Sequence, residues 1–192
     1  MEQKKSRRRR RGGDSVTKHM RAPFGAGVLL LLCAANPTPA DVISATPGGF
    51  EVRETVHVAS SPDKAYALLL TPSHWWNSDH TYSGNAANLT LDARAGGCWC
   101  ESLPDGGSVQ HMTVVYVAPG KALRLRGALG PLGSMAVEGV MTWSIKGAAG
   151  GSDIVLSYAV AGTSPQGLDS LSKSVDQVLA EQIGRLKKLL EA

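Results

Sequence analysis

Two groups of residues in this 192-residue chain have side chains that could do chemistry. Cys98, Cys100 and Glu101 fall in one short predicted strand, and His111 falls in the next. A turn between the two strands would place Cys100 roughly opposite His111. A thiol within hydrogen-bond reach of an imidazole can become a nucleophile. His111 or Glu101 could instead transfer protons as a general acid or base.

The second group is His74, Asp79 and His80, which resembles a loose metal or acid–base cluster. Its spacing matches no regular ligand pattern, so polar residues at the rim of a site are the alternative. The pair Cys98 and Cys100, without a nearby histidine or further cysteine, is too small for a zinc site. We expect no metal and no cofactor.

Two cysteines that are two residues apart on a strand point to the same face, with Cα atoms near the upper limit for a disulfide. The spacing therefore favours two small buried side chains or free thiols over a bridge. Cys98 and Cys100 would face one way, and Trp99 and Glu101 the other.

Aromatic residues make up 5% of the chain, yet three of its four tryptophans fall between residues 71 and 101. Such a concentration is typical of a cavity wall or pocket mouth. The residues predicted to line a ligand site are Trp75, Trp76, Tyr82, Cys98, Cys100, His111, Met135, Trp143, Tyr158 and Val175.

The elements that must position these residues follow from periodicity and turn signals. Alternating residues predict a first strand over 50–59, and Ser61-Pro62 begins a helix. A second short helix over 73–77 would carry Trp75 and Trp76. Six strands are predicted over 89–93, 98–103, 109–118, 123–129, 135–146 and 153–161. Apolar residues at helical spacing from Leu168 onward predict a long C-terminal helix. The fold class is α+β: a curved antiparallel seven-stranded sheet wrapped around this helix, with the first strand paired to the last.

The N-terminal 40 residues differ in composition from the rest. They carry nine Lys/Arg and two Asp/Glu, whereas residues 41–192 carry eleven and fourteen. The folded part is therefore acidic, which argues against nucleic-acid binding. A twelve-residue apolar run, Phe24–Ala35, follows the basic residues and is typical of a signal peptide, with cleavage after Ala40. We expect a secreted or periplasmic protein with no stable membrane span after cleavage.

Several details of this segment stay open. Translation could start at Met1 or Met20. A twin-arginine signal, a lipoprotein signal through Cys33 and an arginine-rich nucleic-acid tail fit the residues less well. Residues 41–48 are predicted to be a linker, and 49–192 a single domain.

The order of elements resembles the helix-grip fold of the START/SRPBCC superfamily, and the local motifs resemble its polyketide-cyclase and heat-shock-ATPase-activator-like branch. The resemblance rests on the turn TPSHWW (71–76), the strand GGCWCE (96–101), the segment HMTVVY (111–116) and the C-terminal helix. It implies a cavity between sheet and helix that holds a small hydrophobic or amphipathic molecule. It does not imply one reaction.

Three functions follow as hypotheses. The first is an exported protein that binds a small hydrophobic ligand. The second is a cyclase- or hydrolase-type enzyme that uses the same cavity. The third is a co-chaperone-like interaction module, against which export counts. The sequence leaves the oligomeric state and the identity of the ligand open.

Overall fold

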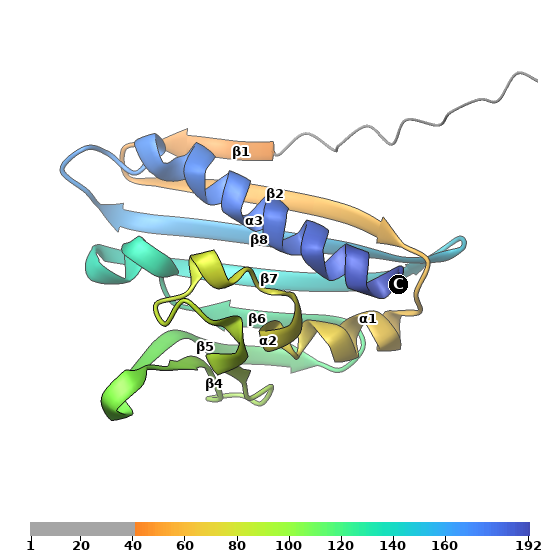
Figure 1. Cartoon of the computed structure of the whole chain (residues 1–192). Helices are drawn as coiled ribbons and strands as arrows, with labels where there is room; N and C mark the ends of the chain where they lie inside the picture. Colours follow the sequence, from red (N-terminus) through yellow and green to blue (C-terminus); the bar gives the residue numbers. More distant parts are fainter. Residues whose placement is uncertain (1–40) are drawn as a thin grey trace, which may run out of the picture. The chain divides into compact units, whose positions relative to one another are not determined.

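The computed structural model describes residues 41–192, which form an eight-stranded antiparallel sheet and a long C-terminal helix (Figure 1). The expected signal peptide and its cleavage site lie outside the described residues. The sheet order is β1-β2-β8-β7-β6-β5-β4-β3. The strands are β1 (Asp41–Thr46), β2 (Gly49–Val58), β3 (Leu89–Leu91), β4 (Cys98–Ser102), β5 (Ser108–Ala118), β6 (Ala122–Arg126), β7 (Ala136–Ala148) and β8 (Gly151–Thr163).

The helices lie together on one side of the sheet. Those of the α type are α1 (Pro62–Leu69), α2 (Pro72–Trp75) and α3 (Asp169–Leu190). Short 3₁₀ turns complete the connections: η1 (Ser78–His80), η2 (Ala86–Asn88), η3 (Pro104–Gly106) and η4 (Gly130–Ser134). Figure 1 shows α3 crossing the face of the sheet, with α1 and α2 beside its C-terminal half. The predicted helix-grip architecture is confirmed.

The beginning of α1 follows from local chemistry. The Ser61 hydroxyl accepts a hydrogen bond from the backbone N–H of Lys64 at 3.3 Å, and Pro62 occupies the first helical position. Asp63 adds a negative charge at the positive end of the helix. Pro72 begins α2 two residues after the C-cap of α1, so the chain turns sharply and carries Trp75 back toward the sheet.

The predicted linker over 41–48 is wrong. Residues 41–46 form the edge strand β1, which pairs with β2, so the sheet has eight strands instead of seven. Nearly all residues of β1 are exposed, so the strand lacks the alternation of buried and exposed residues that identifies the others. The predicted pairing of the first long strand with the last is confirmed, because β2 pairs with β8 along its whole length.

The core lies between α3 and the facing side of the sheet. On α3 it is formed by Leu179, Ile183, Leu186 and Leu190, each at most 3% exposed. Burying side chains of this kind contributes about 1.5–3 kcal/mol each. No helix within residues 41–192 is both long enough and apolar enough to cross a membrane.

Candidate functional site

All four tryptophans form one cluster at the junction of α2 with the sheet. Trp75 contacts Trp76 edge-on, with ring centroids 5.6 Å apart, and contacts Trp143 in the same way at 5.7 Å. Trp76 in turn contacts Trp99 at 4.9 Å. These are favourable aromatic geometries. The cluster therefore fixes the start of the segment that follows α2.

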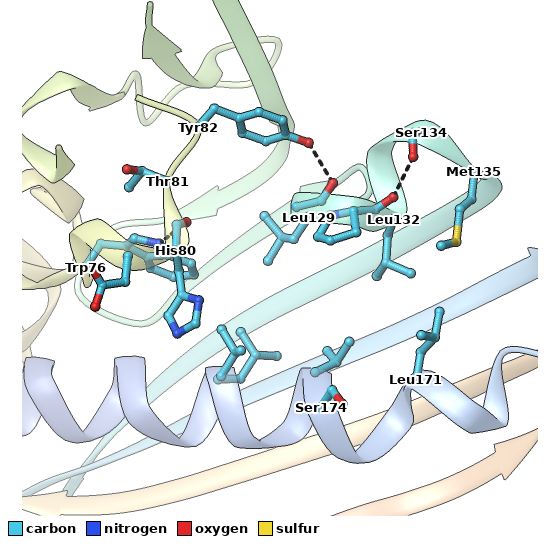
Figure 2. A pocket seen from close by; sticks show the side chains of 16 residues that line it. Trp76, His80, Thr81, Tyr82, Leu129, Leu132, Ser134, Met135, Leu171 and Ser174 are labelled. Carbon is cyan, nitrogen blue, oxygen red and sulfur yellow. Dashed lines mark hydrogen bonds between the residues drawn. The ribbon is translucent and has the colours of Figure 1, made fainter. Parts of the chain in front are cut away.

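That segment, residues 76–82, forms one wall of a pocket of about 670 Å³. Helix α3 forms a second wall and η4 with its flanking residues a third (Figure 2). The pocket is lined by Trp76, Asp79, His80, Thr81, Tyr82, Leu129, Gly130, Pro131, Leu132, Ser134, Met135, Leu171, Ser174, Val175, Val178 and Leu179. The lining is predominantly apolar. Its polar groups are a few hydroxyls and the side chains of Asp79 and His80.

Helix α3 holds residues 76–82 in place through side-chain hydrogen bonds. The backbone N–H of Asn77 donates to Gln182 Oε1 at 2.8 Å, and Asn77 Nδ2 donates to Glu181 Oε1 at 2.6 Å. His80 Nε2 lies 3.3 Å from Glu181 Oε2. The indole N–H of Trp76 donates to the carbonyl oxygen of His80 at 3.0 Å. This wall of the pocket is therefore fastened to α3 at two successive helix positions.

Glu101 holds the other end of the same segment. Its side chain is completely buried, and its carboxylate accepts the backbone N–H groups of Tyr82, at 3.1 Å, and Ser83. His111 Nε2 lies 2.9 Å from the same carboxylate. Burial by itself would raise the pKa of the Glu101 carboxyl, but the hydrogen bonds from Ser83, Tyr82 and His111 outweigh it and lower the pKa. Glu101 is therefore a buried anion that anchors a loop.

A β-bulge brings His111 to this carboxylate. Trp99 pairs with Met112 and Cys100 pairs with Gln110, so His111 is an extra residue on β5. As a result, His111 and Met112 are both buried although they are consecutive. Burial lowers the pKa of His111 more than Glu101 raises it. The imidazole is therefore neutral at pH 7, and its Nε2–H donates to the carboxylate.

Tyr82 connects two walls of the pocket. Its hydroxyl donates to the carbonyl oxygen of Gly130 at 2.8 Å, as Figure 2 shows. The η4 wall is also bonded to the core of the sheet, because the hydroxyl of buried Tyr158 accepts a hydrogen bond from the N–H of Leu129 at 3.1 Å. The ring of Tyr158 fits because Gly139 has no side chain: a Cβ there would lie 2.6 Å from Tyr158 Cε2. Burial raises the pKa of Tyr158 to about 12.

A second pair of buried carboxyls lies between β2 and α3. Glu54 is 5% exposed and Asp176 is 4% exposed, and the two carboxyl groups lie close enough to affect each other's ionisation. One oxygen of each carboxyl, Oε1 of Glu54 and Oδ1 of Asp176, has no partner. Burial raises the pKa of Glu54 to about 8, with further contributions from Asp176 and Asp41, and it also raises the pKa of Asp176. Glu54 is therefore largely protonated at pH 7, and its carboxylic acid can donate to the carboxylate of Asp176.

A family model described as polyketide cyclase / dehydrase and lipid transport matches residues 49–191. The chain belongs to this family. The match begins at β2 and extends through α3, so it includes every residue of the pocket. It supports the predicted START/SRPBCC resemblance and its polyketide-cyclase-like branch.

Solved structures share the fold of this polyketide cyclase-like chain. An uncharacterised protein from Rhizobium leguminosarum superposes with a TM-score of 0.57 at 17% identity, over 77% of this chain and 96% of the other. A protein from Mesorhizobium loti gives 0.53 at 18% identity, over 73% and 96%. The di-domain ARO/CYC StfQ from the steffimycin biosynthetic pathway gives 0.50 at 16% identity, over 76% and 50%. Such identities establish the fold alone. No curated protein matches the sequence.

In this family member the two cysteines differ from the expectation both in their oxidation state and in their position. Cys98 and Cys100 form a disulfide, with Cα atoms 5.4 Å apart, so the expectation of free thiols is wrong. The register of β4 against β5 shifts between Trp99 and Cys100, so the strand is irregular between the two cysteines. Both cysteines lie on the face of β4 opposite to buried Trp99 and Glu101, so neither lines the pocket. A Cys100–His111 dyad is excluded, because Cys100 is oxidised and faces away from His111.

Four other predicted residues lie beside the pocket instead of in its lining. Trp75 and Trp143 are at most 2% exposed and belong to the tryptophan cluster, where the indole N–H of Trp75 donates to the carbonyl oxygen of Leu68 at 3.1 Å. Tyr158 supports η4 from within the core. His111 lies beneath Tyr82, with ring centroids 5.8 Å apart, and like Glu101 it does not line the pocket.

The pocket does bring together Trp76, Tyr82, Met135 and Val175 from the predicted set. The sequence analysis missed the apolar residues of η4 and most of those on α3. The helical spacing of Leu171, Val175 and Val178 on α3 was a signal for these residues. The three are half-buried, whereas Leu179, Ile183, Leu186 and Leu190 are buried. The half-buried residues line the pocket together with Leu179.

The cluster of His74, Asp79 and His80 does not assemble. Asp79 and His80 line the pocket, whereas His74 does not. Within residues 41–192, no group of three or more histidine, cysteine, aspartate or glutamate side chains has a geometry that could hold a metal ion.

Proposed function

We propose that this protein is an exported carrier or receptor that binds a small apolar or amphipathic molecule in the pocket between α3, η4 and residues 76–82. The observation that carries the proposal is a largely apolar pocket of about 670 Å³. Pockets of roughly 300–1,000 Å³ accommodate small organic ligands. Apolar surface that is removed from water on binding contributes about 25 cal/mol per Å² before the cost of association.

The contacts around the pocket favour binding over proton-transfer chemistry. Glu101, the buried acid nearest Tyr82, already accepts three hydrogen bonds and has a lowered pKa, so it is poorly suited to act as a general acid. His111 is bonded to it and covered by Tyr82. Both cysteines are oxidised. An enzyme would have to rely on other groups, so the cyclase or hydrolase alternative has less support.

The family supports the class of ligand. Its description joins polyketide cyclases and dehydrases with lipid transport, and lipids are apolar or amphipathic molecules. One structure with a similar fold, the ARO/CYC protein StfQ, comes from the steffimycin biosynthetic pathway. The family description does not decide between carrier and enzyme, whereas the contacts around the pocket favour the carrier.

Export is supported by two independent features. The first is the basic N-terminal segment followed by an apolar run. The second is the disulfide between Cys98 and Cys100, which is stable in oxidising compartments. Sequencing the N-terminus of the protein isolated from its own host tests this part. A mature chain that begins near Asp41 is expected, and an intact Met1 or Met20 in a reducing compartment would contradict export.

Binding is tested with the neutral fluorescent probe N-phenyl-1-naphthylamine. The wild-type protein should bind the probe with saturable, blue-shifted emission. Val178→Trp places an indole in the pocket and should weaken binding by about tenfold or more. Leu189→Trp is the matched control, because Leu189 is exposed on the same helix and does not line the pocket. Absence of saturable binding, or equal loss in both variants, would refute the proposal.

A further inference from the structure

The charged side chains within residues 41–192 that line the pocket include an acid but no lysine or arginine. Within the part of the chain that the structure describes, the lining contains one carboxylate, Asp79, and one histidine, His80, but no lysine or arginine. Figure 2 shows His80 extending from its segment toward α3. A charged ligand would therefore meet acidic groups at this side of the pocket.

The protonation state of His80 does not reverse this sign. His80 Nε2 lies 3.3 Å from Glu181 Oε2. If His80 is protonated, the carboxylate of Glu181 already balances it, and Asp79 leaves a net charge of −1. If His80 is neutral, the three groups together carry −2. The polar side of the pocket is therefore negative in either case.

The basic residues of α3 do not correct the imbalance. Arg185 donates through Nε to the carbonyl oxygen of Trp75 at 2.9 Å, and Lys187 pairs with Glu191 at 3.6 Å, both toward the C-terminal half of the helix. Lys173 and Lys188 are exposed and do not line the pocket. The N-terminus of a helix attracts anions, but α3 carries Asp169 in its first turn, which offsets that attraction.

We propose that this pocket selects amphipathic molecules with a neutral or cationic head group and disfavours carboxylates. The proposal rests on the binding function proposed above. The apolar body of the ligand lies against Leu132, Val175 and Val178. The head group lies beside Asp79 and His80, where a hydroxyl or ammonium group can donate to the Asp79 carboxylate. A ligand carboxylate at the same place would face Asp79 and Glu181 without a cation to pair with.

The test compares three molecules with the same ten-carbon chain: decan-1-ol, decylamine and decanoate. Each displaces N-phenyl-1-naphthylamine from the full-length protein at pH 7.5 and low salt. Decanoate should bind about tenfold more weakly than decan-1-ol, and decylamine at least as tightly as decan-1-ol. Added salt should narrow the differences, because the groups at the rim are partly exposed to solvent.

Asp79→Asn should bring decanoate to within about threefold of decan-1-ol. The matched control is Asp105→Asn, which changes the net charge equally at an exposed turn that does not line the pocket, and it should leave the wild-type order intact. Equal displacement by decanoate and decan-1-ol, with no effect of Asp79→Asn, would overturn this inference but leave the binding function standing. Failure of the probe itself to bind would overturn both.

Discussion

Glu101 on β4 and Glu54 on β2 are both at most 5% exposed, yet their pKa values move in opposite directions. Each lies on the second strand from an edge of the sheet, at opposite edges. Glu101 receives two backbone N–H groups and an imidazole N–H, whereas Glu54 meets another carboxyl, Asp176. The difference shows that the hydrogen-bond donors a fold directs at a buried acid decide its charge, more than burial does.

The two sites also differ in what they hold together. Glu101 fastens residues 82–83 to the sheet and so fixes one wall of the pocket. Glu54 on β2 and Asp176 on α3 are two buried carboxyls that avoid charge repulsion only while at least one of them is protonated. The stabilisation by Glu101 should therefore be lost as the pH falls, and the stabilisation at Glu54 should be lost as the pH rises.

The largest effect is expected from Glu101→Ala. It leaves two backbone N–H groups and His111 without their buried partner, so we expect a loss of about 3–5 kcal/mol in the free energy of unfolding. Urea denaturation measures this loss. Glu138→Ala is the control, because Glu138 makes an exposed pair with Arg126 and should cost less than about 1 kcal/mol. Similar losses in both variants would contradict the anchoring role of Glu101.

A smaller effect with a distinct pH dependence is expected from Glu54→Gln. The folded protein keeps a proton on Glu54 that the unfolded chain releases near pH 4.5, so the wild type loses stability as the pH rises from about 4.5 to about 8 and changes little above that. Glutamine cannot ionise, and its side-chain amide can donate to the carboxylate of Asp176. Between pH 4 and pH 9 the variant should therefore gain several kcal/mol of stability relative to the wild type, because each unit of pKa shift corresponds to about 1.4 kcal/mol.

This profile is measured by urea denaturation at a series of pH values. Glu101 contributes in the opposite sense, since its lowered pKa gives stability that is lost as the pH falls below about 4.5. Glu54→Gln should leave that acid limb unchanged. Parallel curves for the two proteins between pH 4 and 9 would show that Glu54 does not hold the proton.

The smallest effect is expected from the double variant Cys98→Ser and Cys100→Ser. The disulfide closes a loop of only three residues, so its loss should cost no more than about 1.5 kcal/mol. It lies on the face of β4 opposite to Glu101, so probe binding should be unchanged. A loss as large as that of Glu101→Ala, or a loss of probe binding, would mean that the two faces of β4 are not independent.

Most of the architecture could be predicted from the sequence because it depends on local signals. Alternating residues identified β2 and the later strands, and the apolar spacing identified α3. The edge strand β1 was missed because its exposed side chains have no pattern, and its stability comes from the backbone pairing with β2. That pairing depends on a neighbour and not on the strand's own residues.

The site was less predictable because two of its features depend on distant partners. The spacing correctly places Trp99 and Glu101 on the face opposite to Cys98 and Cys100, but it does not say which face is inside, and the prediction assigned the cysteines to the cavity wall. Glu101 faces inward because residues 82–83, nineteen and eighteen positions earlier, bring N–H groups to it. The sequence can name Trp76, Tyr82 and Val175 as pocket residues, but it cannot show which acid the loop needs.

The bulge at His111 has a consequence for comparing relatives. Because one residue of β5 is unpaired there, residues on either side of it follow opposite inside–outside parity. Suppose that a relative lacks the extra residue. An alignment without a gap at position 111 would then match its inward-facing residues with outward-facing residues of this chain on one side of the bulge. Residue equivalences across β5 should therefore be counted separately on each side of the bulge.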